Sequence, residues 1–294
     1  MPRLAGSSMV ASEGANRHED LMSLAVSSKP VDAIRGGDVS PAKAVLRNLQ
    51  KSFQWAWLDT KCQYRRSRIG PLWETINVVV MLAGLTLVSS SIFGSSMTQI
   101  IGYVGIGIIV WSAISALIVE GSGCFVRNAG YLNCSTFSID LYVGRSVFKI
   151  MITFAHHTII YFLGVALGLV PIGWMSLLAI PGIVFMFVNG FWIVTVLGFI
   201  CARYRDVDLI IRNLLQLAFF VTPVFWNYRA IASDRMFLVD YNVLFYFIEV
   251  IRSPLLGEVP PLSHYLTVLS VTAAGYGLAY IVYRRMRNQL AFFV

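Results

Sequence analysis

Residues with the types needed for catalysis are sparse in this chain of 294 residues. His156 and His157 are adjacent within an apolar segment. Because neighbouring residues on a helix point about 100° apart, the two rings are poorly placed to bind one metal ion. Hydrogen bonding between helices is the favoured interpretation of this pair, and a proton relay is the alternative. Asp240 and Glu249 are the only candidates for the acid–base pair of a membrane enzyme.

The sequence has no motif for binding a nucleotide or a metal. No GxxxxGK[ST] phosphate loop occurs, and the glycines of the GYVGIG run at 102–107 have the wrong spacing for one. No two of the four cysteines have CxxC spacing, which argues against a zinc site and a disulfide framework: Cys62, Cys124, Cys134 and Cys201. We therefore expect this chain to bind no metal and no cofactor of its own.

Two groups of arginines offer a different chemistry. Arg65, Arg66 and Arg68 precede the first long apolar segment, and guanidinium groups can bind phosphate oxygens through paired hydrogen bonds. Anchoring on anionic lipids is the alternative for these arginines. The second group is Arg203, Tyr204, Arg205 and Asp206. Its close opposite charges predict a local ion pair at the start of a helix. This pair would have a structural role or a role at a cytoplasmic gate.

The elements that position these residues are membrane-spanning helices. The chain is 57% hydrophobic and only 13% charged, whereas soluble domains carry about 25% charged residues. Ranges 75–119, 150–202, 213–228 and 259–283 contain no Asp, Glu, Lys or Arg. A bilayer needs roughly 20 apolar residues per helix, and backbone groups in lipid must be paired within helices. We predict an all-α integral membrane protein with six spans: 72–93, 100–119, 146–170, 174–200, 209–226 and 262–283.

The segments outside the spans have separate characters. Residues 1–40 are predicted to be a disordered cytoplasmic tail. Residues 41–70 are predicted to form an amphipathic interface helix followed by a basic run, with an ordinary surface helix as the alternative. Residues 71–294 form the predicted transmembrane domain. Within it, the apolar stretch 236–251 is too short to span and predicts re-entrant or interfacial helices.

The basic residues predict the orientation of the spans. With the N-terminus inside, 20 of the 23 Lys and Arg residues lie on the cytoplasmic side or at helix ends there. Both termini are then cytoplasmic, and nucleic-acid binding is not needed to explain the net charge of +8. The spans contain few titratable groups, whereas ion-coupled transporters keep such groups deep in the membrane. A transporter of this kind would need a separate ATPase.

Three stretches resemble a known family when they are taken together. They are residues 59–73 (DTKCQYRRSRIGPLW), 202–226 (ARYRDVDLIIRNLLQLAFFVTPVFW) and 241–257 (YNVLFYFIEVIRSPLLG). With the six-span pattern, they resemble the permease subunits of ABC transporters that export O-antigen, capsule or teichoic-acid polysaccharides. The resemblance extends over about residues 43–290 and is closest to the O-antigen branch.

The resemblance implies a set of partners. The permease would form a homodimer in the bacterial inner membrane, with two ATP-binding subunits that carry ATP and Mg²⁺. The substrate would be a glycan on a lipid pyrophosphate, whose head group would meet Arg65, Arg66 and Arg68. Sugar rings stack on aromatic faces, which suggests channel-lining residues, although an aromatic belt facing lipid is the alternative: Trp73, Asn77, Phe219, Phe220, Phe225 and Trp226.

Two further segments receive roles from the same resemblance. The polar stretch after the second span is the expected contact for the ATPase, with a helix lying on the membrane as the alternative: Phe125, Arg127, Asn128, Tyr131 and Leu132. The external segment is expected to shape the exit side: Asn242, Glu249, Arg252 and Pro254. The rival functions are an exporter of a drug or small lipid and a membrane glycosyl- or acyltransferase.

Overall fold

The computed structural model describes residues 41–65, 69–70, 72–93, 97–134, 138–230 and 236–293. All regular secondary structure in these ranges is helical, which confirms the predicted all-α class. The chain divides into two units, residues 1–46 and 47–294. The predicted tail, residues 1–40, lies outside the described residues. The helices discussed below belong to the second unit, apart from residues 41–46 at the start of the first described helix.

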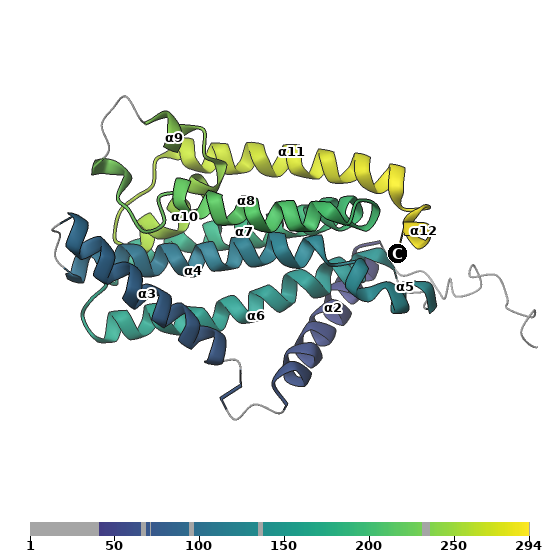
Figure 1. Cartoon of the computed structure of the whole chain (residues 1–294), viewed down its shortest axis with the longest axis horizontal. Helices are drawn as coiled ribbons and strands as arrows, with labels where there is room; N and C mark the ends of the chain where they lie inside the picture. The colour runs from purple at the N-terminus through teal and green to yellow at the C-terminus, as the bar shows by residue number, and fades with distance from the viewer. Residues whose placement is uncertain are drawn as a thin grey trace, which may run out of the picture. The chain divides into compact units, whose positions relative to one another are not determined.

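Five helical segments are long and apolar enough to span a membrane. They coincide with five of the six predicted spans and are α3 (Leu72–Phe93), α4 (Met97–Ser122), α6 (Ile139–Ala166), α7 (Ala179–Arg203) with the preceding 3-10 turn η3 (Trp174–Leu178), and α11 (Leu262–Met286). Figure 1 shows these helices running beside one another. The chain therefore has the helices of a multi-pass membrane protein.

The predicted span at 209–226 is not confirmed. Helix α8 (Asp206–Val221) has 16 residues, so it is about 24 Å long, shorter than a hydrocarbon core of about 30 Å. Thr222 leaves the helix with extended backbone angles, and Pro223 follows it. Because proline lacks an N–H and disfavours helical geometry in the preceding residue, the apolar run continues past Val221 without continuing the helix.

The segments outside the spans form shorter helices. Helix α2 (Pro41–Tyr64) begins at the first residue of the predicted interface helix. The 3-10 turn η2 (Val126–Asn128) and α5 (Ala129–Cys134) follow α4. Between α8 and α11 lie η4 (Tyr228–Ala230), α9 (Phe237–Asp240) and α10 (Val243–Leu255), and α12 (Leu290–Phe293) ends the fold. The 13 residues of α10 bear out the prediction that this stretch is helical but too short to span.

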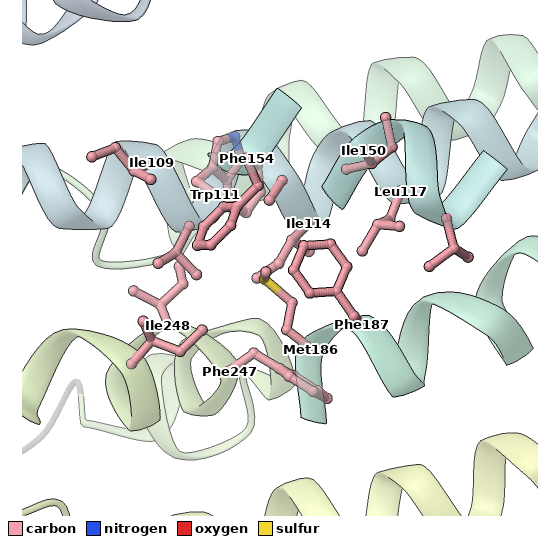
Figure 2. Close-up of a cluster of buried hydrophobic side chains, with 14 of the residues drawn as sticks. Ile109, Trp111, Ile114, Leu117, Ile150, Phe154, Met186, Phe187, Phe247 and Ile248 are labelled. Atoms are coloured by element: carbon pink, nitrogen blue, oxygen red, sulfur yellow. The ribbon is translucent and has the colours of Figure 1, made fainter. Parts of the chain in front are cut away.

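Helix α4 forms the centre of the second unit. It packs against α3, α6, α7, α8 and α10 (Figure 1). Figure 2 shows its buried side chains, among them Ile114 and Leu117, meeting Met186 and Phe187 of α7 and Phe154 of α6. The rings of Phe154 and Phe187 meet edge to face with centroids 5.6 Å apart. In contrast, α11 is largely exposed and lies at the edge of the packed helices.

Polar side chains join the apolar helices at a few points. Nδ1 of His157 lies 3.1 Å from Oγ of Ser112, which links α6 to α4. This bears out the interpretation of His157 as a helix–helix contact, whereas His156 bonds the Ile152 carbonyl of its own helix. Asn189 on α7 donates to the Thr272 hydroxyl on α11 over 2.8 Å. Such bonds satisfy polar groups within apolar spans.

Candidate functional site

An open cleft of about 550 Å³ lies among α3, α4 and α8. Its walls combine three aromatic rings with a hydroxyl, an amide and a guanidinium group among aliphatic side chains. The residues that line it are Met81, Trp111, Ser115, Val119, Arg212, Leu215, Gln216, Phe219 and Phe220. The cleft therefore offers both stacking faces and hydrogen-bonding groups beside helices that have the length and composition of membrane spans.

Phe219 organises the aromatic wall of the cleft. Its ring lies 5.6 Å from that of Trp111 and stacks on Phe225 at 5.6 Å with an interplanar angle of 29°. Phe220 meets Phe225 edge to face, and Nε1 of Trp226 donates to the Phe220 carbonyl over 3.1 Å. The four aromatic residues predicted in this segment therefore come together. Trp111 is not among the predicted residues, because an aromatic residue in an apolar run is equally consistent with core packing.

The other two predicted channel residues lie on α3. Trp73, Asn77 and Met81 follow one another at intervals of four residues, so they occupy one face of the helix. Trp73 and Asn77 are exposed, and Met81 lines the cleft. The two residues thus share the face of α3 that reaches the cleft, although neither of them lines it.

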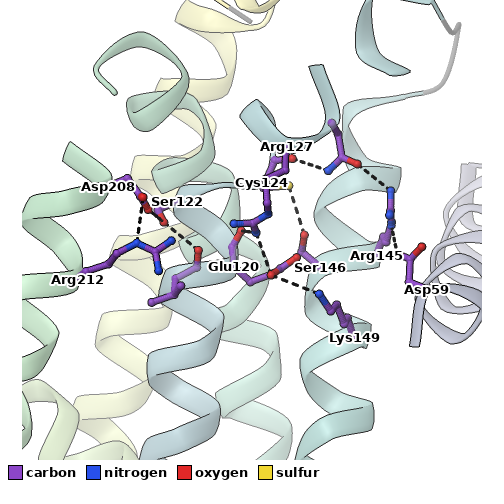
Figure 3. Close-up of polar contacts among 12 residues, drawn as sticks. Asp59, Glu120, Ser122, Cys124, Arg127, Arg145, Ser146, Lys149, Asp208 and Arg212 are labelled. Carbon is purple, nitrogen blue, oxygen red and sulfur yellow. Dashed lines mark hydrogen bonds and ion pairs between the residues drawn. The ribbon is translucent and has the colours of Figure 1, made fainter. Parts of the chain in front are cut away.

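The polar end of the cleft begins at the first turn of α8. Arg212 Nε donates to Asp208 Oδ2 over 3.0 Å, and Ser122 of α4 donates to the other carboxylate oxygen (Figure 3). The hydrogen bond from Arg212, followed by that from Ser122, lowers the pKa of Asp208. A negative charge in the first turn of a helix also interacts favourably with the helix dipole. Asp208 therefore fixes both α8 and the guanidinium group of the cleft.

The predicted ion pair at the start of α8 has different members from those expected. Arg203 donates to the Tyr204 hydroxyl and lies 5.1 Å from the Phe293 ring. Within the described residues, Asp206 forms no ion pair with Arg203 or Arg205, which corrects the expected local pair. The ion pair present at this helix start is Asp208–Arg212. Its spacing of i,i+4 on a helix brings the two side chains together.

More charged side chains gather at the same end of the helices, beside the residues predicted to contact an ATPase. Glu120 pairs with Arg127 at 2.9 Å and with Lys149 at 3.8 Å (Figure 3). Arg145 bonds Asp59 of α2 as well as the side-chain oxygen of Asn128. These contacts tie α2, α4, η2 and α6 together at this end.

The predicted ATPase-contact residues divide into buried and exposed members. Phe125 is fully buried, with its ring 5.0 Å from that of Phe199, so it supports this region from inside. Asn128 donates to the Cys124 carbonyl and Leu132 is partly buried. Arg127 and Tyr131 are accessible, and the Tyr131 side chain is 65% exposed. These two residues are the ones that a partner can reach directly.

The predicted exit-side residues form a buried polar cluster around α10. Arg252, which is completely buried, donates to Glu249 over 2.5 Å and to the Pro223 carbonyl over 2.8 Å. Its guanidinium group lies 3.8 Å from the centroid of the Tyr103 ring on α4. Ser253 donates to the second oxygen of Glu249 over 2.7 Å. Since Pro223 follows α8, this cluster fastens α10 to the turn after α8 and to α4.

Asn242 and Pro254 mark the two ends of α10. The Asn242 side-chain oxygen accepts a hydrogen bond from the backbone of Leu244 over 3.0 Å, as expected for an N-cap residue. Its amide nitrogen donates to Thr222 over 2.9 Å, which gives a second link to the end of α8. Pro254 is buried in the last turn of α10.

The arginines before α3 are only partly described. Arg65 is exposed just after α2, and Arg66 and Arg68 lie outside the described residues. Nearby, the Tyr64 hydroxyl donates to Glu74 over 2.6 Å, which links the end of α2 to the start of α3. The described residues contain no cluster of three or more His, Cys, Asp or Glu side chains that is placed to hold a metal ion.

The cleft can hold a ligand that combines flat apolar faces with hydroxyl groups. Aromatic rings present faces for stacking, Gln216 and Ser115 can bond hydroxyl groups, and Arg212 adds positive charge. No protein-family model and no curated protein matches this chain.

Proposed function

We propose that this chain is the permease subunit of an ATP-driven exporter that carries a lipid-linked cell-surface polysaccharide across the bacterial inner membrane. O-antigen is the preferred substrate class, because the sequence patterns resemble that branch of the family most closely. In this proposal, two copies of the chain pair, and two separate ATP-binding subunits supply the energy.

The chemistry of the cleft is the observation that carries this proposal. A glycan presents sugar rings with apolar faces and many hydroxyl groups. These features match a mostly apolar, aromatic wall around Phe219 that also carries the amide of Gln216. The amides of Asn213 and Gln216 on α8 are also exposed, and exposed polar groups are unfavourable in lipid. A hydrated path, completed by a second copy, accommodates these groups. An exporter of apolar drugs has less need of them.

The arrangement of the charged side chains supports an energy source on a separate subunit. Glu249, the best buried carboxylate for a relay or for catalysis, is held by Arg252 and Ser253, and Asp240 is exposed. This arrangement also weighs against a membrane transferase that would use the two residues as an acid–base pair. The exposed Arg127 and Tyr131 provide a surface for an ATPase beside the ion pairs of Glu120.

Deletion of the gene tests the proposed function. We expect the deletion strain to lose its surface polysaccharide and to accumulate lipid-linked polymer inside the cell. A tagged copy of the chain should restore export and copurify an ATP-binding-cassette subunit. Normal surface glycan in the deletion strain would refute the proposal, and so would restored export without any ATPase partner.

Point variants then test the cleft. Gln216→Leu should lower export several-fold at an unchanged level of protein in the membrane, because it removes a hydrogen-bonding group from the cleft wall. Leu217→Ala is the matched control, since Leu217 is 64% exposed and does not line the cleft. Equal export by wild type and Gln216→Leu would show that the cleft is not part of the transport path.

A further inference from the structure

A second cavity, separate from the cleft, lies among α4, α6, α7 and α10. It has a volume of about 280 Å³, and almost all of its surface is apolar. Ile106 and Ile109 of α4, Phe154 of α6 and Ala179 of α7 form its deep walls, and each of these side chains is at least nine-tenths buried. Ile251 and Leu255 of α10 form the remaining wall.

The mouth of this cavity opens on the outer surface of the spans. The side chains of Phe162 and Ile172 there are 58% and 64% exposed, and those of Leu177 and Ile180 are 56% and 54% exposed. The mouth lies beside the last turns of α6 and the start of α7, whereas the Glu120 ion pairs lie at the opposite ends of these helices. Phe162 and Ile180 lie on helices that are long and apolar enough to span a membrane, so within a bilayer this opening would meet lipid hydrocarbon.

We propose that this cavity binds one acyl chain of a membrane phospholipid. Apart from the hydroxyls of Thr158, Tyr161 and Ser176, the cavity is lined by aliphatic and aromatic groups, which hold water poorly. If it were empty, these walls would lack dispersion contacts. The medium at its mouth is hydrocarbon, and a flexible acyl chain can enter without losing hydrogen bonds. The proposal depends on the chain lying in a membrane and is independent of what the protein transports.

The bound chain would brace α10. Ile251 and Leu255 face the cavity, and Arg252, between them in sequence, is fixed by Glu249 and Pro223. The polar cluster around Arg252 holds one side of α10. An acyl chain in the cavity would pack against the other side. The lipid would act as a structural part of the segment that fastens α8 to α10.

Photolabelling of the wild-type protein tests this proposal. The purified full chain is placed in bilayers of palmitoyl-oleoyl phosphatidylethanolamine with a trace of the same lipid bearing a diazirine on its palmitoyl chain. After irradiation, peptides over 154–162 and 172–183 should carry several-fold more label than α11, whose Leu266 and Leu269 are 54% and 50% exposed. Label spread evenly over all exposed spans would overturn the proposal. So would unlabelled cavity peptides, as expected if a second copy covers the mouth.

A pair of neighbouring substitutions adds a matched control. Thr158 lines the cavity, and its hydroxyl bonds only the Phe154 carbonyl of its own helix among the described residues. Thr158→Phe fills the cavity and should reduce the labelling of 172–183 several-fold. Ile159→Phe changes a 49% exposed side chain that does not line the cavity, and it should leave labelling unchanged. Undiminished labelling of a folded Thr158→Phe protein would overturn the proposal, and if this variant does not fold, the wild-type map decides.

Discussion

Breaking the buried ion pair of Glu249 and Arg252 should cause the largest loss of stability expected from a single substitution. Arg252→Met would leave the Glu249 carboxylate buried without its counter-charge. Removing one member of a buried ion pair costs about 3–5 kcal/mol, and here the bonds to Pro223 and the contact with Tyr103 are lost as well. We expect a fall of that size in the free energy of unfolding, measured by chemical denaturation of the purified protein in detergent.

Two comparisons show whether burial is the cause of this loss. The double variant Glu249→Gln/Arg252→Met removes both charges and should be more stable than Arg252→Met alone. Arg229→Gln breaks an ion pair with Glu258 whose side chains are 55% and 47% exposed, so it should cost less than about 1 kcal/mol. Equal losses for Arg252→Met and Arg229→Gln would contradict the argument.

Helix α11 approaches α7 through a glycine. A Cβ atom at Gly275 would lie 2.3 Å from the Trp192 ring, whereas one at Gly277 meets nothing within 4 Å. Gly275→Ala should therefore destabilise the protein by about 1–3 kcal/mol through overpacking. Gly277→Ala should be neutral or stabilising by up to about 1 kcal/mol, because alanine favours helices. The melting temperatures of the two variants are compared in detergent. Equal values would show that Gly275 and the Trp192 ring are not in close contact.

The start of α8 should respond to acid through Asp208. Its folded-state pKa is lowered, chiefly by the hydrogen bond from Arg212. The stabilisation is therefore present above the unfolded pKa of about 3.9 and is lost as the pH falls through the folded value. Asp208→Asn should lower stability by about 1 kcal/mol or less near neutral pH, and its difference from wild type should shrink below about pH 4.

A neighbouring carboxylate provides the control for Asp208. Asp206 is exposed in the same first turn of α8 and has no ion pair within the described residues. Asp206→Asn should therefore change the acid dependence less than Asp208→Asn does. Chemical denaturation over a pH series measures both variants. If the Asp208→Asn difference persists unchanged in acid, the ion pair does not contribute as argued.

The elements also show where sequence reasoning succeeds and where it does not. Charge-free runs locate five helices that are long and apolar enough to span a membrane, because lipid selects for apolar composition and length. The same signal yields no confirmed span at α8, where the helix ends at Val221, just before Pro223, although the residues remain apolar. Phe219 and Phe225 are recognisable as aromatic neighbours in sequence. Trp111 is not recognisable as part of the cleft, since only the packing of α4 against α8 brings it to Phe219.

At the scale of the whole molecule, the side on which each connection lies depends on whether α8 and residues 222–226 together cross the membrane. Four spans, α3, α4, α6 and α7, separate Cys62 from Glu258 if α8 does not cross. The two positions would then lie on the same side. A fifth crossing through α8 places them on opposite sides, as the six-span prediction requires. Ser89, near the C-terminal end of α3, donates to the Phe225 carbonyl over 3.1 Å. The residues that follow α8 therefore lie beside that end of α3.

Cysteine accessibility distinguishes the two arrangements. In a cysteine-free background, single cysteines are placed at 62, 131, 174 and 258, all of which are exposed. A membrane-impermeant maleimide should label positions 62 and 131 only in inverted vesicles, and 174 and 258 only in intact spheroplasts. Positions 131 and 174 are the controls, because two and three helices that are long and apolar enough to span a membrane separate them from Cys62. Labelling of position 258 together with 62 and 131 would show that α8 turns back, and would place the two termini on opposite sides.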